Sequence, residues 1–306
     1  MTCLKPIIIG RKIRQLTPKN SLSGRVLASL SHSIYLSTHD NIVFWIGDET
    51  VPLHQRCIQL SEVDFRSIPI IEKQPFSFNS ICLQLDPNVS IDISLSRIWI
   101  PPSLDSHSLI PFSELENRID ITYEILSSYY PRKGLGQLLP LINNDHHRDP
   151  FDIKTLSDPF LKTISLIIKD ILEAINHNNK KYFLSRVKKL IGLGSGLTPS
   201  GDDFLGGLYF VWIKLHQLFP KQIPIINFEK ESTENIQQHT NLISATILND
   251  LIQGEGVEPL HDLFNEILSS NADFGIKTHI EKLIKIGSST GWDLLTGFIA
   301  GLYSLL

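Results

Sequence analysis

The sequence has little of what marks several large classes of protein. Among its 306 residues are only three cysteines, Cys3, Cys57 and Cys82, an odd number without the spacing of metal ligands. This pattern favours buried thiols in a reducing compartment over a disulfide framework. The 28 basic and 32 acidic residues give a net charge of only −4. The composition therefore lacks the electrostatic pattern of a protein that binds nucleic acid or an anionic membrane.

Long hydrophobic runs are also missing. The apolar stretch near the N-terminus is too short for a signal peptide. The longest apolar run, 204–213, contains two glycines and is too short to cross a bilayer. The 42% of hydrophobic and 20% of charged residues are ordinary for a globular protein. We therefore expect a soluble, cytoplasmic chain with no nucleic-acid or membrane partner, large enough for two domains.

The hydrophobic pattern changes along the chain. Up to about Pro102, short apolar or alternating segments are separated by turn residues, which is typical of strands. From Ser113 a helical period begins, and Ser113 and Glu116 have the spacing of a capping box. Further helices are predicted at 158–176, 180–190, 204–219, 240–253, 259–269, 276–286 and 293–306. The sequence thus predicts an α+β protein, with a β-rich domain over residues 1–110 and a mostly helical domain over residues 111–306.

One segment of the helical half has an unusual composition. Residues 191–207 read IGLGSGLTPSGDDFLGG, with six glycines, three hydroxyl residues, one proline and two adjacent carboxylates. Glycines at this density allow positive φ angles or a close approach to a ligand. The residues after Leu197 predict a turn into a helix, with Asp202 and Asp203 in its first turn. A glycine-rich loop that runs into a helix is a common way to bind an anion or a polar ligand.

Other interpretations of this loop fit less well. Gly196 and Gly201 have the glycine spacing of a P-loop, but Asp202 and Asp203 stand where a lysine and a hydroxyl residue are required. The dinucleotide-binding pattern fails because its third glycine is missing. A structural alternative is that Ser200 or Asp202 only caps the helix and that the glycines only turn the chain. Capping explains one or two residues and leaves the rest of the composition unexplained.

The C-terminal segment repeats part of the loop. Residues 287–297 read GSSTGWDLLTG, and the alignment places Thr290 on Ser200 and Asp293 on Asp203. Both segments then enter apolar helices, and glycines four residues apart on the second helix share one face that allows close backbone approach. We expect the two helices to pack together and to bring both loops to one site. Chance similarity between short motifs is the alternative.

Other candidate groups have weaker patterns. His146 and His147 lie between two aspartates, but a polar linker has the same composition, and we expect no metal site there. His239 is the nearest candidate base in the helical half, and a surface histidine accounts for it better. Arg132 and Lys133, next to a glycine-rich turn, are candidates for supplying positive charge to an anionic substrate.

Three segments occur together in one order: the loop GLGSGLTPSGDDFLGG, the stretch HTNLISATIL at 239–248, and the tail GSSTGWDLLTG. This combination resembles the AllH-type subunit family of oxamate carbamoyltransferase, most specifically in the loop and strongly from about Lys180 onward. The resemblance implies a cytoplasmic protein that works with two other kinds of subunit late in anaerobic allantoin breakdown, a branch of purine catabolism. There, oxalurate and phosphate are interconverted with oxamate and carbamoyl phosphate. The family also has members outside that pathway.

The resemblance implies roles for both loops. Carbamoyl transfer requires a bound phosphate, a polarised carbonyl and the removal of a proton from a poorly nucleophilic amide. The expected catalytic residues are Thr198, Asp202 and Asp203. The hydroxyl of Thr198 would hydrogen-bond the carbamoyl group, and the carboxylate of Asp202 or Asp203 would hold the amide, act as the base or bind magnesium. The expected substrate-binding residues are Gly194, Ser195, Gly196, Ser200, Gly201, Ser288, Thr290 and Asp293. Two acids beside a phosphate require either magnesium or a raised pKa, so the cofactor stays open.

The chain lacks the phosphate loop of the aspartate and ornithine carbamoyltransferases. Either it uses a different solution, or another subunit contributes essential groups. Two further functions fit the same residues. One is a non-catalytic subunit that binds a small metabolite or assembles the complex, and the other is a transferase or hydrolase that acts on another small amide.

Overall fold

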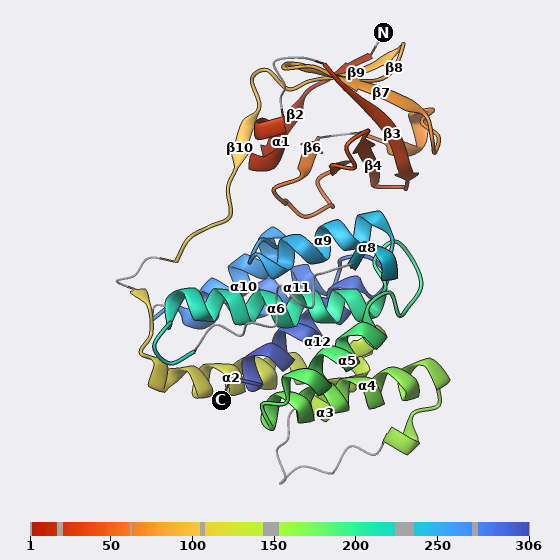
Figure 1. Ribbon diagram of the computed structural model, residues 1–306. Helices are drawn as coiled ribbons and strands as arrows, with labels where there is room; N and C mark the ends of the chain where they lie inside the picture. The colour runs from red at the N-terminus through yellow and green to blue at the C-terminus, as the bar shows by residue number, and fades with distance from the viewer. Residues whose placement is uncertain are drawn as a thin grey trace. The chain divides into compact units, whose positions relative to one another are not determined.

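The computed structural model describes residues 2–16, 21–61, 63–104, 108–142, 153–223, 236–270 and 275–305. The chain divides into two compact units, Met1–Pro102 and Ser103–Leu306 (Figure 1). The first is rich in strands and the second in helices, which confirms the predicted α+β fold. The predicted domain boundary lay at residue 110, a little further along the chain than the division between these units.

The first unit is built on one sheet, with the strand order β1-β9-β8-β7-β3-β4-β5-β6-β2-β10. Strands that follow each other in the chain form antiparallel pairs from β3 to β5 and from β7 to β9, whereas β1–β9, β5–β6 and β2–β10 are parallel pairs. The strands are β1 (Thr2–Leu4), β2 (Pro6–Gly10), β3 (Leu22–Ser29), β4 (Ser33–Thr38), β5 (Val43–Gly47), β6 (Cys57–Leu60), β7 (Pro75–Phe78), β8 (Cys82–Asp86), β9 (Val89–Asp92) and β10 (Arg97–Trp99).

The alternation that predicted these strands matches their burial. In β3, Val26 and Ala28 are buried, whereas Arg25 is exposed, because successive side chains point to opposite faces of the sheet. β5 is buried throughout, as expected for a strand covered on both faces. The short helix α1 (Arg11–Leu16) adds Ile13 to the core of this unit.

The second unit is helical, with α6 and α12 buried over most of their length. Its helices are α2 (Leu115–Ser127), α3 (Leu139–Ile142), α4 (Pro159–Asn176), α5 (Lys180–Leu190), α6 (Ser200–Leu218), α8 (Ile236–His239), α9 (Leu242–Ile252), α10 (Glu258–Leu268), α11 (Gly275–Leu283) and α12 (Thr290–Tyr303). The 3-10 turns named below are η3 (Phe112–Glu114) and η4 (Gly134–Leu138).

Local sequence explains where several helices begin. Asp158 caps α4, Asn179 caps α5 and Asn241 caps α9, each with a side-chain oxygen that accepts from a backbone N–H of the first turn. The predicted capping box of Ser113 is wrong, because η3 leads directly into α2 and places Ser113 inside the 3-10 turn. The polar segment with His146 lies outside the described residues.

Glycines allow α6 and α12 to pack directly against each other (Figure 1). A Cβ added to Gly207 would overlap the carbonyl oxygen of Leu294, and a Cβ added to Gly297 would overlap the carbonyl oxygen of Phe204. The backbones of the two helices are therefore closer than any residue with a side chain would permit at these positions. This confirms the predicted packing of the two helices.

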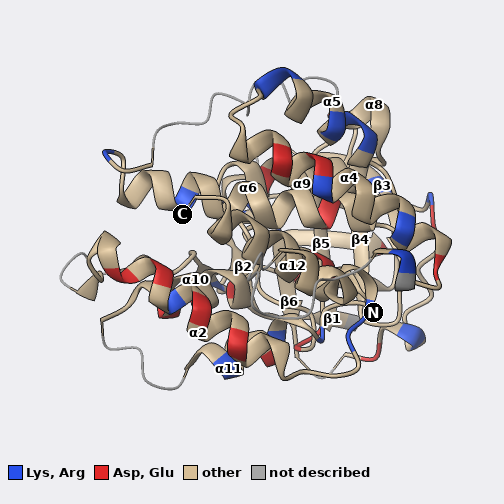
Figure 2. Ribbon diagram, turned by 90° about the horizontal axis from the view of Figure 1, so that it is seen from below, with Lys and Arg blue, Asp and Glu red and all other residues tan. Residues whose placement is uncertain are grey.

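Charged residues mark the outer helices of this unit. Figure 2 shows basic residues on α5 and acidic residues along α2, whereas α12 carries a single charged residue, Asp293. None of the helices within the described ranges is both long and apolar enough to span a membrane.

Candidate functional site

The glycine-rich loop runs from α5 to α6 with left-handed backbone angles. Gly192, Gly194 and Gly196 have φ angles of +75°, +133° and +96°, which residues with a side chain rarely adopt. A Cβ on Gly192 would overlap the carbonyl oxygen of His239. The loop is thus folded tightly onto its neighbour, while Gly194, Ser195 and Gly196 are exposed at its outer edge.

The first turn of α6 has no side-chain cap. Its N-cap is Pro199, whose carbonyl oxygen accepts from the backbone N–H groups of Asp202 (2.9 Å) and Asp203 (3.1 Å). Both acids lie in the first turn, as predicted. The alternative that Ser200 or Asp202 caps the helix is wrong, because both side chains bond to groups of other segments. The composition of the loop therefore needs another explanation.

Asp202 holds the loop against α9. Its Oδ1 accepts from the backbone N–H of Gly192 (2.7 Å), and its Oδ2 accepts from the hydroxyls of Thr240 (2.5 Å) and Ser244 (2.6 Å). The residue is 2% exposed. A second link joins the same segments, since the Asn241 amide donates to the carbonyl of Leu197 (2.9 Å). The geometry favours a positioning role for Asp202, and the catalytic role stays a prediction.

Asp203 lies next to Asp202 but has different surroundings. It is 4% exposed, and its Oδ2 is buried without a hydrogen-bond partner. The hydroxyls of Thr198 and Thr290 bond to its carboxyl group. Burial, and after it the negative charge of Asp293, raise the pKa of Asp203 well above its usual value, although the two hydroxyls oppose the shift. Asp203 therefore keeps its proton to a higher pH than an ordinary aspartate.

Asp293 starts the second helix in the equivalent place. Its Oδ1 accepts from the backbone N–H of Leu135 (2.6 Å) and its Oδ2 from the hydroxyl of Ser289 (2.9 Å), and Ser200 adds a side-chain hydrogen bond. Burial raises the pKa of Asp293, and the three donors oppose this effect. Because Asp293 has these donors and Asp203 has an unpartnered oxygen, Asp293 is the more readily ionised of the two.

The donor from Leu135 belongs to a third loop, which the sequence did not assign to the site. Leu135 lies in η4, directly after Gly134, whose φ is +49°. A Cβ on Gly134 would overlap Oδ1 of Asp293. The glycine is therefore needed for the backbone to approach this carboxylate. In the sequence, the glycines of this turn were the only sign of a close backbone approach. The prediction for this turn concerned the charges of the neighbouring Arg132 and Lys133.

The structure brings together most of the predicted residues that carry side-chain chemistry. Thr198 and Thr290 have hydroxyl oxygens 3.0 Å apart, and their contacts with Asp203 join the two loops. Gly194, Ser195, Gly196 and Ser288 lie at the exposed edges of the two loops. Gly201 is buried against Leu190, and its N–H donates to the carbonyl of Leu193 (2.9 Å), so its contacts are those of packing.

The predicted positive charges are not part of this cluster. Arg132 donates to the carbonyl of Ser127 (2.7 Å), and its guanidinium carbon lies 4.6 Å from the ring centroid of Tyr130. Lys133 is exposed, and His239 is exposed at the end of α8. The groups that act on the two acids are hydroxyls, the backbone N–H of Leu135 and, for Asp203, the negative charges of Asp293 and Asp202. Neutralisation of the pair thus falls to a proton or to a bound cation.

A proton fits the donor set better than a metal ion. Asp293 accepts from three donors, which occupy the oxygen positions that a metal would need. No group of three or more acidic, histidine or cysteine residues with metal-binding geometry occurs in the described parts of the chain. Asp203 offers a metal one oxygen without a partner, so a metal ion there would take most of its ligands from water or a bound substrate.

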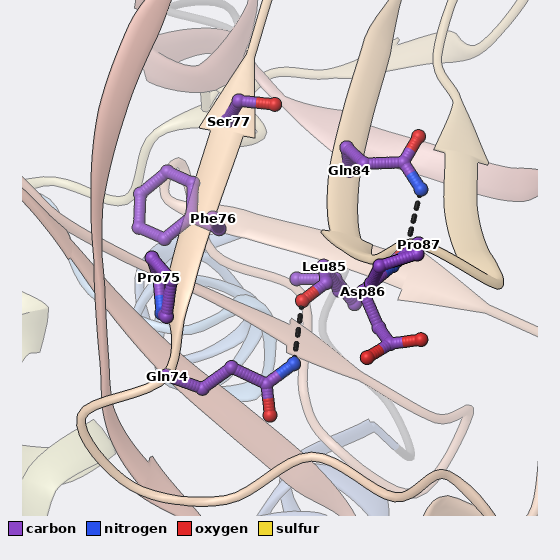
Figure 3. Close-up of a pocket in the computed structure, with 8 residues that line it drawn as sticks. All are labelled: Gln74, Pro75, Phe76, Ser77, Gln84, Leu85, Asp86 and Pro87. Atoms are coloured by element: carbon purple, nitrogen blue, oxygen red, sulfur yellow. Dashed lines mark hydrogen bonds between the residues drawn. The ribbon is translucent and has the colours of Figure 1, made fainter.

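The sheet unit has a separate hollow of about 520 Å³ beside β7 and β8 (Figure 3). The amide of Gln74 donates to the carbonyl of Leu85 (2.8 Å), and the amide of Gln84 donates to the carbonyl of Asp86. The lining residues are Gln74, Pro75, Phe76, Ser77, Gln84, Leu85, Asp86 and Pro87. Because both side-chain amides already donate to backbone carbonyls, we propose no ligand for this hollow.

Residues 190–302 match the protein family described as oxamate carbamoyltransferase subunit AllH. The match begins at the last residue of α5 and ends within α12, so it includes both loops with Asp203 and Asp293. The resemblance predicted from the sequence is confirmed over this segment. No solved structure matches the chain.

Proposed function

We propose that this chain is a subunit of an oxamate carbamoyltransferase and that its helical unit holds the small amide substrate beside Asp203 and Asp293. The family match supports the subunit assignment because it spans both loops. The observation that carries the site is the buried Oδ2 of Asp203, which has no hydrogen-bond partner. Leaving such a group unsatisfied costs about 1–3 kcal/mol. A ligand that supplies the missing partner would recover this free energy on binding.

The two acids complement an amide. Asp203, with its raised pKa, is the protonated member of the pair and donates a hydrogen bond, while Asp293, held by three donors, is the anionic member and accepts one. A carboxamide offers an acceptor oxygen and N–H donors on neighbouring atoms. An acid and a carboxylate side by side therefore match its polarity with no need for a metal ion.

The same pair supplies the proton that the reaction needs. When phosphate attacks the carbamoyl carbon of oxalurate, the bond from this carbon to the amide nitrogen breaks, and the nitrogen of the departing oxamate takes a proton. Asp203 is the donor of that proton. In the reverse direction the oxamate NH₂ attacks carbamoyl phosphate, the carbon–oxygen bond to phosphate breaks, and the Asp203 carboxylate takes the proton back. The exposed backbone around Gly194 and Gly196, close to the start of α6, is the element suited to the phosphate.

Assays of phosphate-dependent oxalurate cleavage test this proposal, with the chain alone and with its partner subunits. Asp203→Asn keeps the size and the acceptor oxygen of the side chain but cannot transfer a proton. We expect it to assemble normally and to lower turnover by about 10²- to 10⁴-fold. The matched control is Asp170→Asn on α4, where the carboxylate pairs with Arg186 at 3.1 Å. Full turnover of the Asp203→Asn complex would falsify the catalytic role.

The same variant separates catalysis from simple binding. If Asp203→Asn complexes keep full turnover but this chain no longer binds oxamate, the chain is a metabolite-binding subunit and another subunit carries out the chemistry. If the wild-type complex cleaves no oxalurate but another small amide, the substrate assignment is wrong and the site stands.

A further inference from the structure

The stretch 239–248 is one of the three segments that carry the family resemblance, but the reaction proposed above gives it no role. It contains the last residue of α8 and the first part of α9. Its first six residues, 239–244, contact the glycine-rich loop on either side of the exposed tip 194–196. The segment 239–244 is called the clamp below, because these contacts hold the loop before and after its tip.

The start of the loop is held through a buried carboxylate. Oδ1 of Asp202 accepts from the N–H of Gly192 (2.7 Å). Its Oδ2 accepts from the hydroxyls of Thr240 and Ser244, both in the clamp. The backbone of Gly192 also lies so close to the carbonyl oxygen of His239 that a Cβ would overlap it. Gly192 therefore cannot leave the clamp without breaking a hydrogen bond and opening a tight backbone contact.

The end of the loop is held by Asn241. Its Oδ1 caps α9 by accepting from the N–H groups of Ile243 (3.0 Å) and Ser244 (3.0 Å). The amide oxygen is therefore fixed at the start of the helix, and the NH₂ group points the other way. This group donates to the carbonyl oxygen of Leu197 (2.9 Å). One side chain thus both starts α9 and holds the loop.

The hydrogen bond from Asn241 fixes the direction of a peptide group. In a trans peptide the C=O and N–H bonds point in opposite directions. Because the carbonyl of Leu197 faces Asn241, the N–H of Thr198 faces away from the clamp. A rotation of this peptide group would exchange the two and present a carbonyl oxygen in place of a donor. Asn241 therefore determines whether the loop offers a donor or an acceptor at this position.

The tip of the loop consists of available donors. Within the described parts of the chain, the backbone N–H groups of residues 194–196 and of Thr198 donate to no protein acceptor. Gly194 and Gly196 have φ angles of +133° and +96°, and glycine has more backbone freedom than any other residue. A free tip would lose this freedom on binding a ligand, whereas a tip held on both sides has already lost much of it. The clamp therefore prepares the loop for a ligand that accepts hydrogen bonds.

We propose that the clamp positions the glycine-rich loop to bind an oxyanion and that Asn241 is a positioning residue for this ligand. The inference rests on the proposed function in taking phosphate as the oxyanion. A rotated peptide group between Leu197 and Thr198 would set a carbonyl oxygen against the anion, where a backbone N–H is needed. Loss of the Asn241 hydrogen bond therefore weakens the binding of phosphate. It leaves the binding of the amide unchanged, because the amide is held at Asp203 and Asp293.

Steady-state kinetics of the complex with its partner subunits test this inference, with the variant Asn241→Ser. Serine caps a helix as well as asparagine does but is too short to reach Leu197, so the variant keeps the cap of α9 and loses the contact with the loop. The KM for phosphate should rise about two- to tenfold, as expected for the loss of one hydrogen bond. The KM for oxalurate, and kcat at saturating phosphate, should stay unchanged.

Asn179→Ser is the matched control. Asn179 caps α5 by accepting from the N–H of Tyr182 (3.1 Å), so this variant makes the same exchange at a helix cap away from the clamp. It should change neither KM nor kcat. The inference fails if Asn241→Ser leaves the KM for phosphate unchanged. It also fails if Asn241→Ser lowers kcat and raises both KM values alike, because a general loss of structure has that effect.

The proposed function and this inference can fail separately. If the wild-type complex cleaves no oxalurate, the proposed function is wrong, and calorimetry with inorganic phosphate takes the place of the kinetics. Phosphate binding that is weaker in Asn241→Ser than in both the wild type and Asn179→Ser would then support the role of Asn241. Equal phosphate binding by all three complexes, or no phosphate binding by the wild type, would overturn it.

Discussion

Replacing Asp203 by asparagine is expected to stabilise the helical unit, although the side chain lies in its core. The wild-type carboxyl has a buried Oδ2 without a partner and a second acid, Asp293, close enough to raise its pKa. Asparagine keeps an oxygen for the hydroxyls of Thr198 and Thr290. Its NH₂ group takes the place of the unpartnered oxygen and can donate to the carboxylate of Asp293. The substitution thus removes an unsatisfied group and adds a favourable contact.

The magnitude follows from the unsatisfied group. A buried polar atom without a partner costs about 1–3 kcal/mol, and we expect Asp203→Asn to raise the free energy of unfolding by this amount at pH 7. In a unit of this size, each 1 kcal/mol raises the melting temperature by roughly 2–4 °C. Urea unfolding followed by circular dichroism measures the change directly. The same variant should lose turnover, so a gain in stability accompanies a loss of function.

The neighbouring acid provides a control with the opposite sign. Both oxygens of Asp202 accept hydrogen bonds, from Gly192, Thr240 and Ser244. Asparagine has a single acceptor oxygen, so at least one of these three donors must give up or reverse its hydrogen bond, and Asp202→Asn should lose about 1–3 kcal/mol. If Asp203→Asn is as destabilised as Asp202→Asn, the account of Asp203 as an unsatisfied acid is wrong.

Three further outcomes follow. The stability advantage of Asp203→Asn should be smallest near pH 4 and grow as the pH rises. The reason is that the raised pKa makes the wild-type contribution of Asp203 full below the ordinary value of 3.8 and lost as the pH rises toward the folded-state value. Urea titrations that show a constant difference would refute this. Gly297→Ala should lower the free energy of unfolding by about 1–3 kcal/mol, since its Cβ would overlap the Phe204 carbonyl, and an unchanged urea midpoint would contradict the close helix packing. Burial raises the pKa of the Cys57 thiol to about 12, so in the folded chain a disulfide reagent at pH 8 should modify the exposed Cys3 and spare Cys57, and equal rates would show that Cys57 is accessible.

The sequence was sufficient to predict the pairing of α6 with α12, because small residues at helical spacing allow two helix backbones to approach closely. Gly207 and Gly297 occupy matching places in the two motifs, and each removes a side chain that would separate the backbones. The alignment of Asp293 with Asp203 depended on the same spacing. Such information is local, so periodicity and motif comparison were enough to extract it.

The different roles of Asp202 and Asp203 could not be predicted in this way. Adjacent acids look equivalent in a sequence, but successive residues of an α-helix point about 100° apart. Asp202 therefore faces Ser244 on α9 and Thr240 just before it, whereas Asp203 faces α12. The difference depends on which helix covers each side of α6, and this is set by tertiary packing.

The contribution of η4 could not be predicted for another reason. The donor to Asp293 is the backbone N–H of Leu135, and every residue except proline has such a group. Gly134 and Gly136 showed that the backbone bends there, but no side chain pointed to its target. A site built from backbone donors leaves a weaker trace in the sequence than one built from side chains.

The first turns of α6 and α12 differ at the positions that face different neighbours and agree at the positions where the two helices face each other. The counterpart of Asp202 is Trp292, which packs against Gly136 of η4, whereas Asp202 binds to α9. These outward positions are fitted to the segments that cover them. Asp203 and Asp293 occupy matching positions and are the same residue type, although burial raises the pKa of both. Helix packing would be served better there by apolar side chains, so packing alone leaves the pair unexplained, and the ligand proposed above would account for it.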